Sequence, residues 1–178
     1  YFGSWNLAYK ISEDIKNDIQ SAEYVWFSHG HPDHLNPSSY KKFIGKSILL
    51  PDHVGGRICT GLREAGFQVS VLPDRKWIEM SSNIKIFCIT TIIQDAVLLL
   101  DINGKLFVNL NDAGTRGCVT TIRKIVKQYK DSYLLTLSGY GDADMINFYD
   151  ENGSFIEPLA ANNKLVGNQL SLVARSIG

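Results

Sequence analysis

The apolar positions in the first part of the chain follow two periods in turn. Runs of apolar and β-branched residues predict buried strands at 24–27, 47–50 and 67–72. Apolar residues that recur every three or four positions predict helices over 11–22 and 54–65. Asn36-Pro37-Ser38 is typical of a helix cap followed by proline at the first helical position, and predicts a helix to about Gly45. Strand and helix therefore alternate, which is typical of βαβ units and indicates a largely parallel sheet.

The middle of the chain changes to a meander of strands. Apolar or alternating segments joined by short turns predict strands at 76–80, 84–89, 96–102 and 105–110. The pair Asn103-Gly104 is typical of a tight β-hairpin turn. The last third predicts a helix over 119–129, a strand at 133–137, an irregular stretch over 151–163 and a helical tail from about Lys164. Two α/β stretches around a meander indicate two sheets that face each other.

The length and composition are those of one globular domain. With 178 residues, 44% of them hydrophobic and 20% charged, the chain can bury a substantial core. The formal net charge is zero, so there is no electrostatic attraction to nucleic acid or to an anionic membrane surface. No apolar run approaches the roughly 20 residues of a membrane-spanning helix. We therefore expect a single domain over 1–178 that acts on a small-molecule substrate.

Cysteine use and the lack of a recognisable signal peptide favour the cytoplasm. The three cysteines are widely spaced and form no CxxC pair, so we expect buried thiols and not a disulfide framework at Cys59, Cys88 and Cys118. The first residue is Tyr1 and not methionine, so a leader that has been removed stays an open alternative. The sequence does not indicate an oligomeric state.

Three of the four histidines lie in the loop after the first predicted strand, in the order Ser28-His29-Gly30-His31-Pro32-Asp33-His34-Leu35. Metal-binding imidazoles must converge on a point about 2 Å away, and a loop leaving a buried strand can hold them rigidly. The spacing H-x-H-x-D-H places His29 and His31 on one side, while Asp33 and His34 can turn toward a second ion. Mixed imidazole and carboxylate ligands suit zinc, iron or manganese. The alternative is a polar turn that happens to be rich in histidine.

Residues 29–34 resemble the signature of the metallo-β-lactamase superfamily, and the order of predicted elements fits its αββα sandwich of two α/β halves. The resemblance implies a dinuclear site, zinc first, whose ions are bridged by an aspartate at a strand end in the second half. Asp112, between the strand 105–110 and a helix expected near Thr115, takes that role. The segments His-Pro-Asp-His-Leu-Asn and Asn-Leu-Asn-Asp also resemble the branch with sialic-acid nucleotide hydroxylases and ascorbate-phosphate lactonases.

Two histidines of the family pattern are missing. One is expected between the cluster and the bridging aspartate, where Gln94 and Asp95 are the available substitutes. The other is expected near the end of the second half, and no histidine follows His53. Either the chain is a fragment of a longer protein, incomplete at both ends, or the site is reduced to one metal or none. We favour a fragment for the terminal histidine and a real departure for the internal one.

Two further residues are candidates to contact the substrate. His53 follows a strand that should run parallel to the one before His29, so its loop should open toward the same edge. Tyr140 lies in a glycine-flanked loop after a predicted strand. A solvent-exposed turn is the alternative for His53. Arg57 is one of three arginines that could hold a phosphate or carboxylate, with surface placement as the default.

The leading functional hypothesis is a metal-dependent hydrolase. A metal lowers the pKa of a bound water to near 7 and so presents hydroxide to an ester, lactone, amide or phosphoester. Asp33 or Asp112 would orient that nucleophile. The same donor types can hold two irons, so an oxygen-activating, hydroxylase-like oxidoreductase is the second hypothesis. A degenerate, non-catalytic metal-binding module is the third, because two expected histidines are missing.

Overall fold

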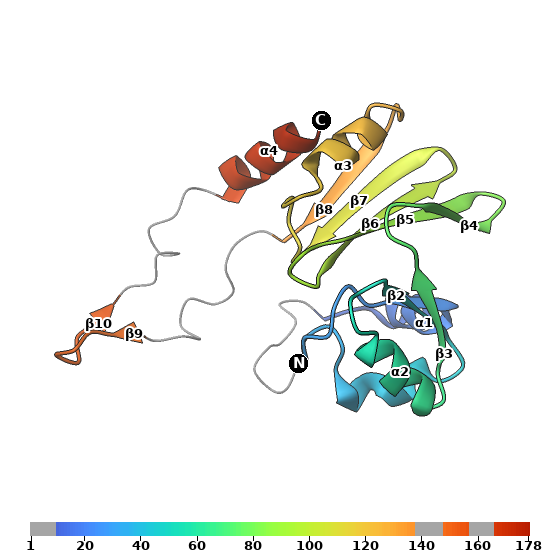
Figure 1. The fold of residues 1–178 in the computed structure, drawn as a ribbon, viewed down its shortest axis with the longest axis horizontal. Helices are drawn as coiled ribbons and strands as arrows, with labels where there is room; N and C mark the ends of the chain where they lie inside the picture. Colours follow the sequence, from blue (N-terminus) through green and yellow to red (C-terminus); the bar gives the residue numbers. More distant parts are fainter. Residues whose placement is uncertain (1–9, 138–147, 157–165) are drawn as a thin grey trace.

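The computed structural model of the chain describes residues 10–137, 148–156 and 166–178. Within these ranges two sheets face each other, and helices cover their outer sides (Figure 1). The αββα layering expected from the order of elements is confirmed. The predicted substrate residue Tyr140 lies outside the described residues.

The first sheet is parallel and is built by the N-terminal part of the chain. Its strands stand in the order β1 (Tyr24–Trp26), β2 (Ser47–Pro51), β3 (Gln68–Leu72). The helical elements around them are α1 (Glu13–Ser21), the 3₁₀-helix η1 (Pro37–Phe43) and α2 (Arg57–Glu64). Ser12 and Asn36 cap α1 and η1 through side-chain oxygens that accept backbone N–H groups. Because the strands are parallel, the loops after β1 and β2 leave the sheet at the same edge.

The second sheet is a meander with one parallel strand added at its end. The strands stand in the order β4 (Trp77–Ser81), β5 (Ile84–Thr90), β6 (Ala96–Ile102), β7 (Lys105–Asn111), β8 (Ser132–Thr136). Pairing is antiparallel except between β7 and β8. At the predicted hairpin between β6 and β7, Asn103 and Gly104 both have positive φ, 52° and 76°. Two successive left-handed residues are what a type I′ turn requires, which explains the Asn-Gly pair.

Helices and a small hairpin complete the described residues. They are α3 (Val119–Val126), the antiparallel strands β9 (Phe148–Tyr149) and β10 (Phe155–Ile156), and α4 (Val166–Ile177). The hairpin overlaps a stretch expected to be irregular. None of the helices in the described part of the chain is long and apolar enough to cross a membrane.

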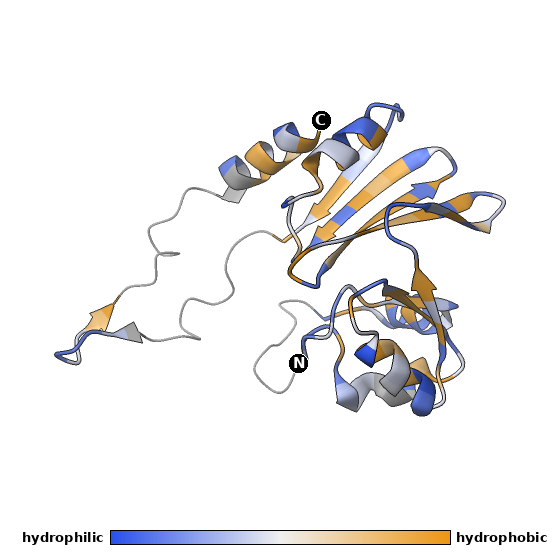
Figure 2. Cartoon of the chain, in the orientation of Figure 1, coloured by the Kyte–Doolittle hydropathy of each residue, from blue (hydrophilic) through white to orange (hydrophobic). Residues whose placement is uncertain are grey.

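Three apolar layers hold the fold together. Between the sheets, the central residues Leu49, Leu72 and Cys88 are each less than 8% exposed. On the outer side of the second sheet, Leu99 of β6 and Ile122 of α3 are fully buried in one apolar cluster. A third cluster lies between the first sheet and α2, and Figure 2 shows hydrophobic residues concentrated along the strands. Each buried aliphatic side chain contributes about 1.5–3 kcal/mol, so these layers fix how the two strand edges meet.

The helix expected near Thr115 begins later. Gly114 and Gly117 adopt left-handed backbone angles, with φ of 60° and 71°, inside a run of turns that follows β7. A regular α-helix cannot pass through such residues, so α3 starts at Val119. This turn carries the chain from the strand that ends at Asn111 back over the sheet.

Candidate metal centre

The histidine-bearing loop after β1 is anchored at both ends in the core. Phe27 is 6% and Leu35 9% exposed, and both belong to the apolar cluster under the first sheet. The backbone N–H groups of His34 and Leu35 both donate to the carbonyl oxygen of His31, at 3.0 and 2.8 Å. The loop is therefore a compact turn whose polar side chains project from a rigid support.

The predicted ligand side chains come together. Nε2 of His29 lies 2.8 Å from Nδ1 of His31, and Nε2 of His34 lies 3.1 Å from Oδ2 of Asp112. Oδ2 of Asp33 lies 3.6 Å from Nε2 of His34. Among the described residues, His29, His34 and Asp112 each offer one donor atom, and these atoms lie within 4.8 Å of one another. Imidazole nitrogens and carboxylate oxygens at this spacing are the donor set of a transition-metal site.

Asp112 reaches the histidines from the opposite sheet. The pairing of β7 with β8 shifts register between Asn109 and Asn111, and Asn111 has a φ of 48°. This irregularity turns the chain at the strand end, where Asn109 Oδ1 accepts the backbone N–H of Asn111 at 3.1 Å. The side-chain amide of Asn111 donates to Oγ of Ser28, immediately before the histidines. Ser28 and Asn111 therefore connect the two sheets directly beside the histidines, and neither residue was a predicted site residue.

Asp95 occupies the region where the family pattern expects a histidine. Its carboxylate is 5% exposed, Oδ1 lies 3.3 Å from Nδ1 of His29, and the backbone N–H of Ala96 donates to it at 2.7 Å. The loop is held by Thr91, whose Oγ1 donates to the Asp95 carbonyl at 2.9 Å. Oγ of Ser28 lies 2.8 Å from the same nitrogen, so Nδ1 of His29 has two polar neighbours, and the carboxylate of Asp95 favours the tautomer with the proton on Nδ1. Asp95 thus faces the ring nitrogen opposite the one that faces His31.

Burial governs the electrostatics of His29. It lowers the pKa of His29 below its usual value, the neighbouring Asp95 carboxylate opposes this effect, and His34 and His31 add to the lowering. The ring is therefore neutral at physiological pH, which is the form that binds metal. A carboxylate behind a buried imidazole is the arrangement that orients metal-binding histidines in many proteins.

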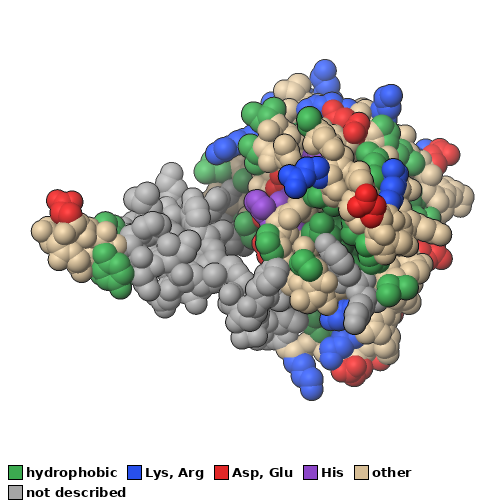
Figure 3. Space-filling model, turned by 60° about the horizontal axis from the view of Figure 1, so that its bottom comes forward, with side chains coloured by type: hydrophobic (Ala, Val, Ile, Leu, Met, Phe, Trp, Pro, Cys, Tyr) green, Lys and Arg blue, Asp and Glu red, His purple; other side chains and the backbone are tan. Residues whose placement is uncertain are grey.

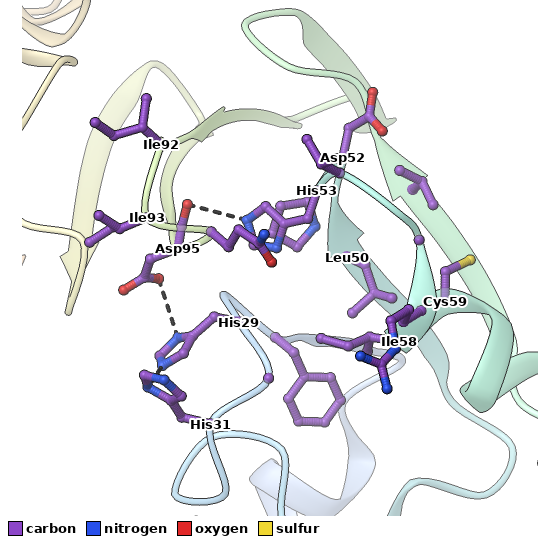
Figure 4. A pocket seen from close by; sticks show the side chains of 18 of the residues that line it. His29, His31, Leu50, Asp52, His53, Ile58, Cys59, Ile92, Ile93 and Asp95 are labelled. Carbon is purple, nitrogen blue, oxygen red and sulfur yellow. Dashed lines mark hydrogen bonds and ion pairs between the residues drawn. The ribbon is translucent and has the colours of Figure 1, made fainter.

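His53 lies at the same strand edge, as expected from the parallel sheet. It extends from the loop between β2 and α2, and its Nε2 donates to the carbonyl oxygen of Asp95 at 3.2 Å (Figure 4). Gln94, the other substitute considered for the missing histidine, has a left-handed φ of 59°. Its side chain is exposed, whereas that of Asp95 is buried against His29. Of the two, Asp95 is therefore the residue that contacts the histidine cluster.

A cavity of about 640 Å³ adjoins these residues, and we call it the β2/β5 cavity. His29, His31 and Asp112 line one end of it. The loop that carries His53 and the loop that carries Asp95 line its sides (Figure 4). The volume is in the range of sites that hold small organic molecules.

Comparison with known proteins gives distant relatives. No family model matches the chain. Two curated proteins are 23% identical over 117 residues: inactive cytidine monophosphate-N-acetylneuraminic acid hydroxylase from Homo sapiens and cytidine monophosphate-N-acetylneuraminic acid hydroxylase from Gorilla gorilla gorilla. The match covers 61% of this chain but only 23% and 20% of these relatives, so the chain spans a minor part of their length.

Solved structures resemble the chain over most of its length. An isothiocyanate hydrolase from Delia radicum gut bacteria superimposes with a TM-score of 0.55 and 14% identity, over 90% of this chain and 60% of that one. A mutant of CmlA β-hydroxylase superimposes with a TM-score of 0.54 and 16% identity, over 86% of this chain and 33% of that one. The chain has the metallo-β-lactamase fold. One neighbour with this fold is named a hydrolase and the other a hydroxylase, so the fold does not choose between the two reactions.

Proposed function

We propose that the chain is a metal-dependent hydrolase acting on an ester, lactone, amide or phosphoester. The observation that carries the proposal is the meeting of His29 and His34 from one sheet with Asp112 from the other. Imidazoles and a carboxylate brought together from residues 78 positions apart fit a metal ion better than a structural hydrogen-bond cluster. These donor atoms are the ones that the H-x-H-x-D-H loop and Asp112 were expected to supply to a metal ion.

Five residues would hold two ions, zinc first, with iron or manganese as alternatives. His29 and His31 present ring nitrogens to one position, and Asp33 and His34 flank the other. Asp112 would bridge the two. When bound, such a metal lowers the pKa of a water to near 7 and supplies hydroxide at neutral pH.

The protein's own groups prepare this chemistry. The carboxylate of Asp95 beside Nδ1 favours the tautomer of His29 with its proton there, which leaves the Nε2 lone pair free to bind a metal. The carboxylates of Asp33 and Asp112 can each accept a proton or a hydrogen bond from the attacking water, which orients it. The β2/β5 cavity would receive the substrate, because His29, His31 and Asp112 are among its lining residues.

Metal analysis combined with a hydrolysis assay tests the proposal. We expect the purified full chain to hold zinc and to hydrolyse members of a panel of p-nitrophenyl esters, lactones and bis(p-nitrophenyl) phosphate. Chelation should abolish turnover and added Zn²⁺ should restore it, while His31→Ala should lose both metal and turnover. Hydrolysis that survives chelation and His31→Ala would refute the assignment. His53→Gln, which removes an imidazole outside the proposed ligand set, is the matched control for metal content.

An oxygen-activating oxidoreductase is the second candidate. The curated relatives and one structural neighbour are named hydroxylases, and the same imidazole and carboxylate donors suit iron. Stoichiometric iron together with O₂ consumption in the presence of an electron donor would favour it over the hydrolase. Weak metal binding without either turnover would instead indicate the degenerate module.

A further inference from the structure

We propose that the β2/β5 cavity binds the neutral, apolar body of the substrate while the metal centre holds its reactive group; this rests on the proposed function. The cavity is open to solvent between two loops, one after β2 and one between β5 and β6. Its 640 Å³ exceed what a water cluster at a metal needs and match a small organic ligand. The cavity is thus large enough for a small organic substrate whose reactive group would lie at the end next to the metal centre.

The floor of the cavity is apolar. Phe27 and Leu50 are 6% and 4% exposed, and Ile58 packs against them as part of the cluster under the first sheet. Core packing holds these side chains in place, so the floor of the cavity stays apolar. A ligand placed on this floor meets only hydrocarbon and an aromatic ring, which favours apolar surface.

The rim of the cavity is apolar and exposed. Val54 on one side is 90% exposed, and Ile92 and Ile93 on the other are 99% and 55% exposed. Figure 3 shows a histidine side chain at the molecular surface with hydrophobic side chains close to it. Single exposed aliphatic residues are ordinary on protein surfaces. Three such residues, distributed over the two loops that flank one cavity, form an apolar entrance. A bound apolar ligand would cover them and remove their surface from water.

The charges of the cavity argue for a neutral ligand. Among the described lining residues, Arg57 is the one lysine or arginine, and the carboxylate of Asp52 lies on the same rim. The other lining carboxylates, Asp95 and Asp112, belong to the metal centre. One cation balanced by one rim anion leaves no excess positive charge for a phosphate or a carboxylate. An anionic group on the body of the substrate, away from the metal centre, therefore lacks a recognition group here.

One polar group gives the ligand an orientation. His53 donates through Nε2 to the Asp95 carbonyl, so Nδ1 of the same ring is left as an acceptor. A ligand hydroxyl or amide N–H is the complementary donor. The substrate class that fits is a neutral small molecule with an aliphatic or aromatic body and a hydrolysable group at one end.

A homologous series of ligands tests how binding affinity depends on the length of the apolar chain that the cavity holds. Straight-chain alkyl hydroxamic acids, from acetohydroxamic to octanohydroxamic acid, are titrated into the zinc-loaded full chain. Burial of each added methylene should tighten binding about fourfold until the cavity is filled. Affinity that stays constant along the series, or that rises when the chain ends in a carboxylate, would overturn the proposal.

Two exposed isoleucines provide a matched pair of variants. Ile92→Ser should weaken octanohydroxamic acid several-fold and leave acetohydroxamic acid unchanged, because only the longer chain reaches the rim. Ile44 is 72% exposed and is not among the described residues that line the cavity, so Ile44→Ser should change neither affinity. Equal losses in the two variants would contradict a specific role of the rim.

A metal-free titration separates this inference from the proposed function. 1-Hexanol added to the chelated protein should shift the isoleucine methyl NMR signals of Ile58, Ile92 and Ile93 and not that of Ile44. If hexanol binds there but hydroxamates show no dependence on zinc, the hydrolase proposal fails and the apolar cavity stands. If hydroxamates bind through zinc with no dependence on chain length, the cavity proposal fails and the metal centre stands.

Discussion

Oδ1 of Asp95 lies 3.3 Å from Nδ1 of His29, and each residue is 5% exposed. The two come from different sheets of the sandwich, since His29 follows β1 and Asp95 precedes β6. A buried carboxylate next to a buried imidazole favours a proton on the ring nitrogen that faces it. The nitrogen of His29 that would bind a metal therefore depends on a residue outside the predicted ligand loop.

Replacement of Asp95 by asparagine tests this pairing. Asp95→Asn keeps the side-chain shape but removes the charge, and we expect zinc affinity to fall about 10- to 100-fold. Competition with a fluorescent zinc chelator measures the change. Asp52→Asn removes an exposed carboxylate from the cavity rim and should leave zinc affinity within about twofold, as expected for a solvated charge. Equal zinc affinity in the wild type and Asp95→Asn would contradict the positioning role.

Ser28 should contribute to stability apart from any metal. It is 2% exposed, its Oγ accepts from the side-chain amide of Asn111, and the same oxygen lies 2.8 Å from Nδ1 of His29. Ser28→Ala leaves the half-buried side-chain amide of Asn111 without this acceptor, so the free energy of unfolding should fall by about 1–3 kcal/mol. Urea denaturation of the chelated protein measures it. Ser70→Ala, at an exposed position of β3, should change the free energy of unfolding by less than about 0.5 kcal/mol. A loss as large as that of Ser28→Ala would show that the hydrogen bonds of Ser28 are not the cause.

Two glycines near the cavity should respond in opposite directions to alanine. A Cβ on Gly30 would lie 2.6 Å from Cδ1 of Ile58, whereas a Cβ on Gly61 in α2 meets nothing within 4 Å. Gly30→Ala should destabilise by about 0.5–1.5 kcal/mol, because the flexible end of the Ile58 side chain must leave its rotamer to make room. Gly61→Ala should stabilise by about 0.5–1 kcal/mol because alanine restricts the unfolded helix segment.

A second substitution decides whether the Gly30 effect is steric. Ile58→Val removes Cδ1, so the double variant Gly30→Ala, Ile58→Val should lose less stability than the two single losses added together. The coupling is obtained from urea denaturation of all four proteins. Strict additivity would show that the contact with Ile58 is not the cause.

Tyr129 should give the fold an alkaline sensitivity. Burial and a hydrogen bond to Asp101, 3.0 Å from the phenol oxygen, raise the pKa of Tyr129 to about 12. An unfolded tyrosine ionises near pH 10, so its favourable contribution is complete below about pH 10 and is lost as the pH rises toward 12. Tyr129→Phe should therefore flatten the fall in unfolding free energy between pH 10 and pH 12, measured by urea denaturation. The same flattening in Tyr24→Phe, at a 44% exposed position of β1, would argue against the assignment.

Local patterns were sufficient for much of the fold. The predicted strand 96–102 coincides with β6, and the Asn103-Gly104 turn has the expected conformation. These features depend on alternation and on residues that tolerate positive φ, both of which are visible in a short window of sequence. The apolar stripe gave the start of α3 at Val119 correctly, but the helix expected near Thr115 was placed too early, because the left-handed angles of Gly114 and Gly117 could not be known from the sequence.

The candidate site was predicted in part. The loop with His29 and His34 and the approach of Asp112 were expected, and the structure brings these three residues together. The direct contact of Asp95 with His29 was not foreseen, because it depends on how the loop between β5 and β6 packs against the other sheet. Metal binding and the catalytic roles remain predictions, as does the role of Tyr140 outside the described residues.

The contact between His34 and Asp112 also bears on chain entropy. These residues are 78 positions apart, and an ion bound to both would tie that length of chain into a closed loop. In the unfolded chain, a permanent tie of this length would remove conformational freedom worth about 4–5 kcal/mol. An ion bound only in the folded state instead stabilises according to its concentration and affinity. The temperature of unfolding would then rise with the concentration of free metal ion, so the folded fraction of the protein would report how much of that ion is available.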